Sequence, residues 1–478
     1  MKPRSLHRSL LVVVSLLLIL PPSAADLAAL RGRLSSLVAH PGLRGAGVGV
    51  EVADLATGEV LFDYNALQPL TPASVMKLVS GATALEYLGP EHVFLTTAAA
   101  ADPIGPDGAL AGDLYLVGSG DPTVQTADLK ALAAELRQAG LRRVSGNIVA
   151  DAGCFADMGP GSGWDPRDED YRYAAEIAGL ALNWNALEVA VVPAKSVGRP
   201  AEIRTIPRTG YVGLENSTRT VSGSRRGIIS ADRRSGTNIL KVSGTIGRWH
   251  APVTCIRTVH EPDLYAACVF REALVAAGIA VEGQHARGRT PEQALVLAQH
   301  QSKPLRDIFV PMMKHSANLT AECLYRTASF AVEGQGSAFA SARLACALLE
   351  AAGADTGPLV LADASGLSRR DRLTADCLVR LLRYMWLRGA YPDVFVDALP
   401  IAAVDGTLKK RMAGTRAANN LRAKTGTLTG VCSLAGYVVS ADGELLCFAI
   451  LMSGYQGGAD RPRRIQDQMG VALAEFRR

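Results

Sequence analysis

The sequence of 478 residues lacks the short motifs that mark several enzyme classes. It contains no G-x-S-x-G, no H-E-x-x-H, no phosphate-binding P-loop and no two histidines spaced four residues apart. These absences argue against an α/β-hydrolase, a zincin-type metallopeptidase and a P-loop nucleotidase. There is also no C-x-x-C pair, so a zinc ribbon or a thioredoxin-like site has little support.

The chain also lacks a strong charge of either sign. The formal net charge is +5, and Lys2, Arg4 and Arg8 supply three of these charges, which leaves +2 for the rest. This near balance excludes a nucleic-acid binder that relies on overall basic charge. Hydrophobic residues make up 48% of the sequence and charged residues 20%, as in folded globular proteins. At roughly 150 residues per domain, the length allows about three compact units.

Long hydrophobic runs are missing, except for a short one near the start. Residues 1–25 have a basic beginning, an apolar run over 10–20 and a small-residue cleavage site, which is the pattern of an export signal peptide. The alternative is an uncleaved membrane anchor, but the run is shorter than the roughly 20 residues that cross a bilayer. We expect cleavage before Asp26 and export to the periplasm or cell envelope.

The eight cysteines allow two interpretations. An even number in an exported protein is compatible with disulfides, and eight cysteines permit 105 pairings. Buried free thiols that pack as small apolar residues are equally compatible with the sequence.

Strands and helices alternate in blocks along the chain. Residues 45–64 have the pattern of a β-hairpin, and Ser74 begins an amphipathic helix that Gly89 ends. The next block, up to about residue 294, consists mainly of short β-branched runs and turns, with one helix near 129–139. The last block predicts helices at 318–331, 337–352, 374–387 and 462–476, and strands at 421–425, 431–439 and 444–452. Strands at both ends of the chain predict one α/β (α+β) domain that is interrupted by an insertion.

The first candidate motif for catalysis is Ser74-Val75-Met76-Lys77, the only S-x-x-K in the chain. At the start of a helix, the spacing of three residues places the Ser74 hydroxyl and the Lys77 amine on one face. A lysine whose pKa is lowered by burial or by a second cation can accept the proton of a serine nucleophile.

The second candidate motif is Ser316-Ala317-Asn318, with a hydroxyl that could relay a proton and an amide that could bind a substrate amide. Another S-x-N occurs at residues 145–147. Lys424 follows Ser316 by 108 residues but Ser145 by 279, and the shorter interval fits one closing domain. We therefore favour Ser316 and regard Ser145 as structural.

The third candidate motif is Lys424-Thr425-Gly426-Thr427, on a predicted strand. Gly426 leaves room for a bound peptide, and the flanking lysine and hydroxyls can meet a carboxylate. An edge strand of this kind can bind a peptide by strand addition.

The three motifs in this order are far more specific than any one of them. On them the sequence resembles the penicillin-recognising serine enzymes, and within these the low-molecular-mass class C penicillin-binding proteins, which are D-Ala-D-Ala carboxypeptidases and endopeptidases of the DacB type. The resemblance extends from near Gly47 to near Met452. It includes the segments 116–122, 181–185, 316–322, 365–369, 406–409, 422–430 and 435–437.

The resemblance implies a serine β-lactamase/transpeptidase-like fold, an antiparallel sheet flanked by helices. Residues 26–95 and 295–478 would form this penicillin-binding catalytic domain. Residues 96–294 would form an inserted β-rich region of two modules, one nested in the other near residues 120–185. A compact class A β-lactamase has no such insertion.

The resemblance also implies catalytic roles. Ser74 would attack the carbonyl carbon of the penultimate D-Ala, and Lys77 would accept the serine proton. Ser316 would pass the proton toward the leaving amine, with Lys424 beside it. Asn318 would hold the amide side of the substrate.

Further roles concern binding. Thr425 and Thr427 would meet the terminal carboxylate of the substrate, with Gly426 between them. The backbone N–H groups of Ser74 and Thr427 would form the oxyanion hole.

We therefore expect a serine-type D-Ala-D-Ala carboxypeptidase that acts on peptidoglycan stem peptides through an acyl-enzyme and is inhibited covalently by β-lactam antibiotics. The sequence leaves open whether the protein also has DD-endopeptidase activity. We expect no cofactor, metal or nucleic acid, and at most peripheral contact with a membrane. The alternatives are a β-lactamase on the same scaffold and an inactive peptidoglycan-binding protein.

Overall fold

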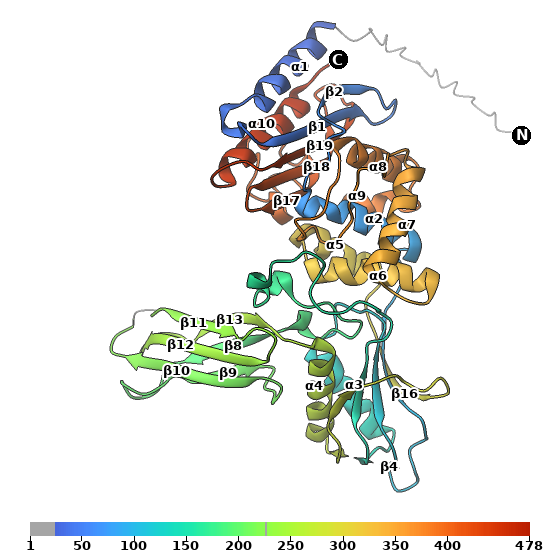
Figure 1. Cartoon of the computed structure of the whole chain (residues 1–478), viewed down its shortest axis with the longest axis vertical. Helices are drawn as coiled ribbons and strands as arrows, with labels where there is room; N and C mark the ends of the chain where they lie inside the picture. Colours follow the sequence, from blue (N-terminus) through green and yellow to red (C-terminus); the bar gives the residue numbers. More distant parts are fainter. Residues whose placement is uncertain (1–23, 225–226) are drawn as a thin grey trace, which may run out of the picture.

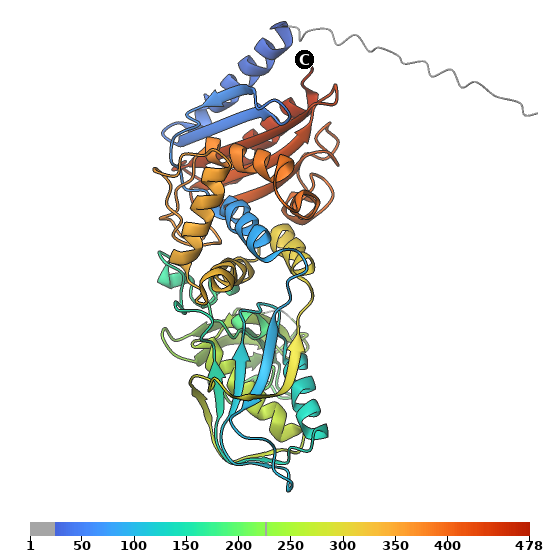
Figure 2. The same cartoon turned by 90° about the vertical axis from the view of Figure 1, so that its right-hand side faces the viewer.

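The computed structural model of the protein describes residues 24–224 and 227–478. Both ends of the described chain lie in one part of an elongated molecule, which we call the main domain, and the middle of the chain forms the rest, which we call the insertion (Figure 1). The side view shows the same division along the long axis (Figure 2). The predicted export signal lies outside the described residues, apart from its last two positions.

The main domain is built on a five-stranded antiparallel sheet of order β17-β18-β19-β1-β2. The sheet joins the two ends of the sequence, because Gly47 of β1 pairs with Ser453 of β19. The strand that carries Lys424 is therefore an edge strand. The strands are β1 (Gly47–Asp54), β2 (Val60–Tyr64), β17 (Arg422–Leu428), β18 (Val431–Val439) and β19 (Leu445–Ser453).

Helices cover both faces of this sheet, as the family resemblance implies. On one face, α1 (Ala24–Val38) and α10 (Asp460–Glu475) pack on each other and bury apolar residues such as Ile465 and Met469 against the strands. The helices on the other side enclose a second core. They are α2 (Met76–Leu88), α5 (Leu305–His315), α6 (Asn318–Glu333), α7 (Ala338–Ala351), α8 (Ala375–Leu387) and α9 (Pro392–Asp397).

The first part of the insertion is a five-stranded sheet of order β15-β7-β5-β3-β16, on which α3 (Thr126–Gln138) and α4 (Pro262–Ala276) pack. Beside it lies a small sheet of order β14-β6-β4. The strands are β3 (Leu95–Ala100), β4 (Ala109–Leu110), β5 (Leu114–Gly118), β6 (Arg143–Val144), β7 (Ile148–Asp151), β14 (Ala280–Val281), β15 (His285–Arg287) and β16 (Leu295–Gln301).

Two three-stranded sheets form a second part of the insertion, which we call the outer module and which projects to one side in Figure 1. Their orders are β13-β8-β9 and β10-β12-β11. The strands are β8 (Ala186–Val192), β9 (Glu202–Ile206), β10 (Gly213–Val221), β11 (Ile229–Arg233), β12 (Ile239–Gly247) and β13 (Val253–Thr258).

The strand pairing differs from the expected domain limits in two places. The outer module begins at Ala186, after the range 120–185 in which the sequence analysis places the nested module. That range holds α3, β6, β7 and a long segment of turns that runs over the main domain. The strand β16 begins at Leu295 and pairs with β3, so it belongs to the sheet of the insertion and not to the main domain.

Four helices of the structure are missing from the sequence-based prediction: α1, α4, α5 and α9. The helix α4 is buried on nearly all sides, so its sequence has no polar face to reveal a helical period. The helix α5 contains Pro311, which is unfavourable inside a helix and obscures the pattern.

All eight cysteines are free, and six of them are buried. The structure therefore favours the interpretation of the cysteines as packed thiols. Within the two described stretches, no helix is both long enough and apolar enough to cross a membrane.

Candidate active site

Ser74 lies in a short 3-10 helix, Ala73–Val75, that leads directly into α2. Ala73 has a left-handed backbone with a φ of 47°, which turns the chain sharply in front of the serine. Gly426 of β17 packs against this turn. A Cβ at Gly426 would lie 2.6 Å from the carbonyl oxygen of Pro72 and 2.9 Å from the backbone nitrogen of Ser74. The glycine therefore lets the edge strand approach the serine closely.

Lys77 lies one helical turn after Ser74 and is completely buried. Its Nζ atom donates hydrogen bonds to Ser74 Oγ at 3.1 Å, to Asn318 Oδ1 at 2.7 Å and to the carbonyl oxygen of Ser365 at 2.6 Å. Burial lowers the pKa of Lys77 from 10.5 to about 8, although the nearby carboxylate of Asp363 opposes this shift. A substantial fraction of this amine is therefore neutral near physiological pH.

Two buried carboxylates hold the segment that supplies the Ser365 carbonyl group. Glu322 of α6 accepts hydrogen bonds from the backbone N–H groups of Ala364 and Ser365, both at 3.0 Å. Asp363 accepts from the N–H of Gly366 at 2.6 Å. Burial raises the pKa of Glu322, whereas the ion pair with Arg326, at 2.7 Å, opposes this shift.

A second buried lysine lies on β17, the strand that packs against the turn before Ser74. Lys424 of β17 donates from Nζ to Ser316 Oγ at 3.0 Å and to the carbonyl oxygen of Thr425 at 2.9 Å. Burial lowers the pKa of Lys424 well below its usual value, and the charge of Lys77 lowers it further. Ser316 has a left-handed backbone, with a φ of 58°, between α5 and α6. This turn directs the start of α6, and with it Asn318, toward Lys77.

The structure thus brings together all five residues that the sequence analysis selects for catalysis. Hydrogen bonds join Ser74, Lys77 and Asn318 in one group and Ser316 and Lys424 in another. Ser74, Ser316 and Asn318 line one cleft, so the two groups are neighbours. The arrangement has a hydroxyl nucleophile, a neighbouring amine base and a second hydroxyl that is bound to a second amine.

Of the three predicted binding residues, only Thr427 lines the cleft beside the nucleophile. Thr427 lines a cleft of about 930 Å³ together with Ser74, Ser316 and Asn318. Thr425 does not line this cleft, and its hydroxyl shares a hydrogen bond of 2.7 Å with that of Thr407. Gly426 packs against the backbone near the serine, as described above.

The insertion supplies the opposite wall of the cleft, which the sequence analysis does not predict. Tyr171 and Tyr173, with rings stacked at 5.5 Å, line it from the segment of turns. Asn318 Nδ2 donates to the carbonyl oxygen of Tyr173 at 2.8 Å. Trp164 of the same segment donates from Nε1 to the buried Asp363 at 2.7 Å. The inserted segment is therefore part of the site.

Glu322 is another site residue without an assigned role in the sequence analysis, but it leaves a signal in the sequence. Asn318, Glu322 and Arg326 follow one another at intervals of four residues and so share one face of α6. Polar residues on a helix face that is otherwise buried indicate a buried polar network.

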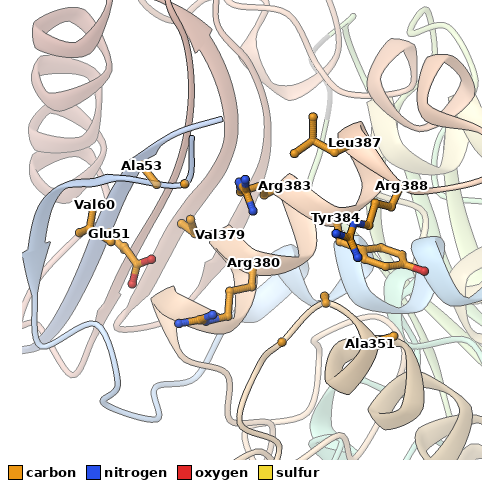
Figure 3. Close-up of a pocket in the computed structure, with 13 residues that line it drawn as sticks. Glu51, Ala53, Val60, Ala351, Val379, Arg380, Arg383, Tyr384, Leu387 and Arg388 are labelled. Atoms are coloured by element: carbon orange, nitrogen blue, oxygen red, sulfur yellow. The ribbon is translucent and has the colours of Figure 1, made fainter. Parts of the chain in front are cut away.

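A second pocket lies at the other edge of the main sheet and holds none of these residues. Figure 3 shows Glu51 of β1 on one side of it, and Arg380 and Arg383 of α8 on the other. Burial raises the pKa of Glu51 to about 7. The pocket has a volume of about 290 Å³ and no serine or cysteine nucleophile in its lining.

The comparisons with known proteins agree with this geometry. Residues 30–476 match the family described as D-Ala-D-Ala carboxypeptidase 3 (S13). A D-alanyl-D-alanine carboxypeptidase of Actinomadura sp. (strain R39) is 40% identical over 470 residues, which cover 95% of this chain and 86% of that protein.

Solved structures of penicillin binding protein 4 (dacB) from Haemophilus influenzae are also similar. One has a TM-score of 0.81 at 26% identity and covers 93% of this chain and 99% of its own. Another, in complex with a β-lactam, has a TM-score of 0.76 at 25% identity and covers 93% and 100%. With the family match over nearly its whole length and the serine–lysine groups in place, the chain belongs to the D-Ala-D-Ala carboxypeptidase 3 (S13) family of penicillin-binding serine peptidases.

Proposed function

We propose that the protein is a serine D-Ala-D-Ala carboxypeptidase that acts on the stem peptides of peptidoglycan. The observation that carries this proposal is the contact of the buried Lys77 amine, whose pKa is about 8, with the Ser74 hydroxyl at 3.1 Å. The activity named for the similar Actinomadura protein supports the choice of substrate.

In the proposed acylation step, neutral Lys77 accepts the proton of Ser74 while Oγ attacks the carbonyl carbon of the penultimate D-Ala. The backbone N–H groups of Ser74 and Thr427 stabilise the oxyanion of the tetrahedral intermediate. The proton that Lys77 has accepted passes through the Ser316 hydroxyl to the leaving amine, the C–N bond breaks, and D-Ala leaves with Lys77 neutral again. Lys424 keeps the Ser316 hydroxyl oriented through its hydrogen bond of 3.0 Å.

In the proposed deacylation step, water attacks the ester carbonyl carbon and gives a proton to the base. The C–O bond to Ser74 breaks, and Lys77, which is bonded to Ser74 Oγ, returns the proton to the serine oxygen. A β-lactam would enter the same path, because opening of its ring leaves the acyl group on Ser74 and the former leaving amine still attached. A similar protein that forms a complex with a β-lactam supports this inhibition. A cross-linked stem peptide as substrate would give DD-endopeptidase activity by the same steps.

We also propose that the protein is exported and works in the cell envelope. The export pattern of residues 1–25 supports this location, and the proposed substrate, which lies outside the cytoplasm, agrees with it.

Release of D-Ala from a short synthetic peptide that ends in D-Ala-D-Ala tests the proposal. We expect release by the wild type and none by Ser74→Ala. Ser36→Ala is the matched control, because Ser36 is exposed on α1 and its hydroxyl donates to the Gly32 carbonyl group of the same helix, away from the cleft. Failure of the folded wild type to release D-Ala would contradict the proposal, and rapid turnover of penicillin instead would favour the β-lactamase.

A further inference from the structure

The insertion carries a groove of about 470 Å³ between α3 and the outer module. Three large apolar side chains that line it are exposed: Trp184 at 38%, Ile206 at 56% and Ile256 at 42%. Lys130 and Glu188 add charged groups to the same lining. Apolar walls with a few polar groups are typical of ligand sites, and none of these residues takes part in the chemistry proposed above.

The backbone around Trp184 is held in a rare conformation. Asn183, Trp184 and Asn185 have φ values of 50°, 57° and 54°, all in the left-handed region. Asparagine tolerates this region, but for a bulky residue such as tryptophan it is an outlier. Strain of this kind persists where the surroundings enforce it, and it clusters at functional sites.

The two asparagines enforce this conformation. Asn183 Nδ2 donates to Thr126 Oγ1 at 2.8 Å, and Asn183 Oδ1 accepts from the N–H of Thr126 at 3.1 Å. Asn185 is fully buried and donates to the carbonyl oxygen of Glu176 at 2.7 Å. The side chains on either side are thus anchored while the indole of Trp184 stays at the surface.

Arg172 connects this groove to the active-site cleft. Its guanidinium lies 4.4 Å from the centre of the Trp184 ring, a cation–π contact that fixes the plane of the indole. Its chain neighbours Tyr171 and Tyr173 line the active-site cleft. A single short segment therefore borders both sites, and a polymer bound at Trp184 can reach the cleft.

We propose that the Trp184 groove binds the glycan strand to which the stem peptides of the substrate are attached. A pyranose ring has one apolar C–H face that stacks on an indole, and its N-acetyl and hydroxyl groups suit polar side chains such as Lys130 and Glu188. The proposal rests on the proposed function for the choice of polymer. It assigns to the insertion the recognition of peptidoglycan strands, beyond the peptide that is cleaved.

Direct binding tests the proposal without any catalytic activity. The probe is the tetrasaccharide of β-1,4-linked N-acetylglucosamine, titrated into the full-length protein and followed by NMR shifts of the tryptophan indole N–H groups. We expect saturable shifts of the Trp184 signal that are lost in Trp184→Ala. The matched control is Trp249→Ala, because Trp249 is also exposed and stacked on an arginine, at 4.6 Å, but does not line this groove.

A kinetic comparison then links the groove to catalysis. We measure kcat/KM for D-Ala release from glycan-linked stem peptides and from the same peptides freed of glycan by an amidase. In Trp184→Ala, we expect the ratio of the two values to fall by about tenfold, the typical loss of one aromatic anchor, through KM and not kcat. Trp184→Phe, which keeps an aromatic ring, should restore part of the ratio.

Two results would overturn the proposal: no saturable binding of the tetrasaccharide to wild type, or an equal defect of Trp184→Ala on peptides with and without glycan. The second result would mean that the groove binds peptide. The test of the proposed function is independent of this one. A protein that binds the tetrasaccharide at Trp184 but releases no D-Ala would contradict the carboxypeptidase activity and still support the glycan site.

Discussion

The ionisation of Lys77 makes the strongest quantitative prediction. The amine can accept the serine proton only when it is neutral, so acylation should follow its titration. With a pKa of about 8, about one-tenth of Lys77 is neutral at pH 7, against roughly one part in three thousand for a lysine at the ordinary value of 10.5. Burial therefore raises the population of the base about 300-fold.

The assay is the second-order rate of acylation by a fluorescent penicillin between pH 5.5 and 10. We expect the rate to rise about tenfold per pH unit below the midpoint and to level off above about pH 8. Lys77→Met should abolish acylation, whereas the exposed Lys409→Met should keep the wild-type profile. A rate that does not change between pH 6 and 9, or a rate that still rises about tenfold per pH unit up to pH 10, would refute the assignment of Lys77 as the base.

Three further substitutions test separate parts of the site. Ser316→Ala should lower the acylation rate by about a hundredfold, whereas Ser145→Ala, in the other S-x-N sequence, should not change it. Gly426→Ala adds a Cβ 2.6 Å from a backbone oxygen that precedes the nucleophile; it should slow acylation and lower the free energy of unfolding by about 1–3 kcal/mol in urea titrations. Trp164→Phe leaves the buried Asp363 without one donor, at 2.7 Å in the wild type, and should cost about 1–3 kcal/mol in the same titrations. Unchanged stability in the last variant would show that this link between insertion and main domain is not important.

The sequence is informative about the main domain because its signals are local. The S-x-x-K motif depends on helical spacing, and the structure shows Ser74 and Lys77 in contact one turn apart. The predicted strand 431–439 coincides with β18. Nearly all of its residues are buried, because helices cover both faces of the sheet, so its sequence does not alternate between apolar and polar residues. The order of the three motifs also leads to the family that the comparisons show.

The sequence says less where contacts depend on irregular backbone. The carbonyl groups of Ser365 and Tyr173 bind Lys77 and Asn318, but a backbone carbonyl group has no signature in a sequence. The sequence analysis predicts that the Thr425 hydroxyl meets the carboxylate of the substrate. In the structure this hydroxyl is bonded to that of Thr407, and the pattern around Thr425 gives no sign of this contact between two separate segments.

The placement of the nested module fails for a related reason. Short strands separated by turns look alike along the sequence, and only their pairing shows that residues 186–258 form the outer module. The helix α4 is missed for a different reason: it is buried on nearly all sides, and a helix without a polar face has no amphipathic period in its sequence.

The central claim is that Ser74 forms a covalent acyl-enzyme, and intact-mass spectrometry of the protein after incubation with benzylpenicillin tests it most directly. We expect one added penicillin mass, located on the peptide that contains Ser74, absent from Ser74→Ala and lost only over hours. Absence of an adduct on the folded wild type, or an adduct that persists in Ser74→Ala, would contradict the account.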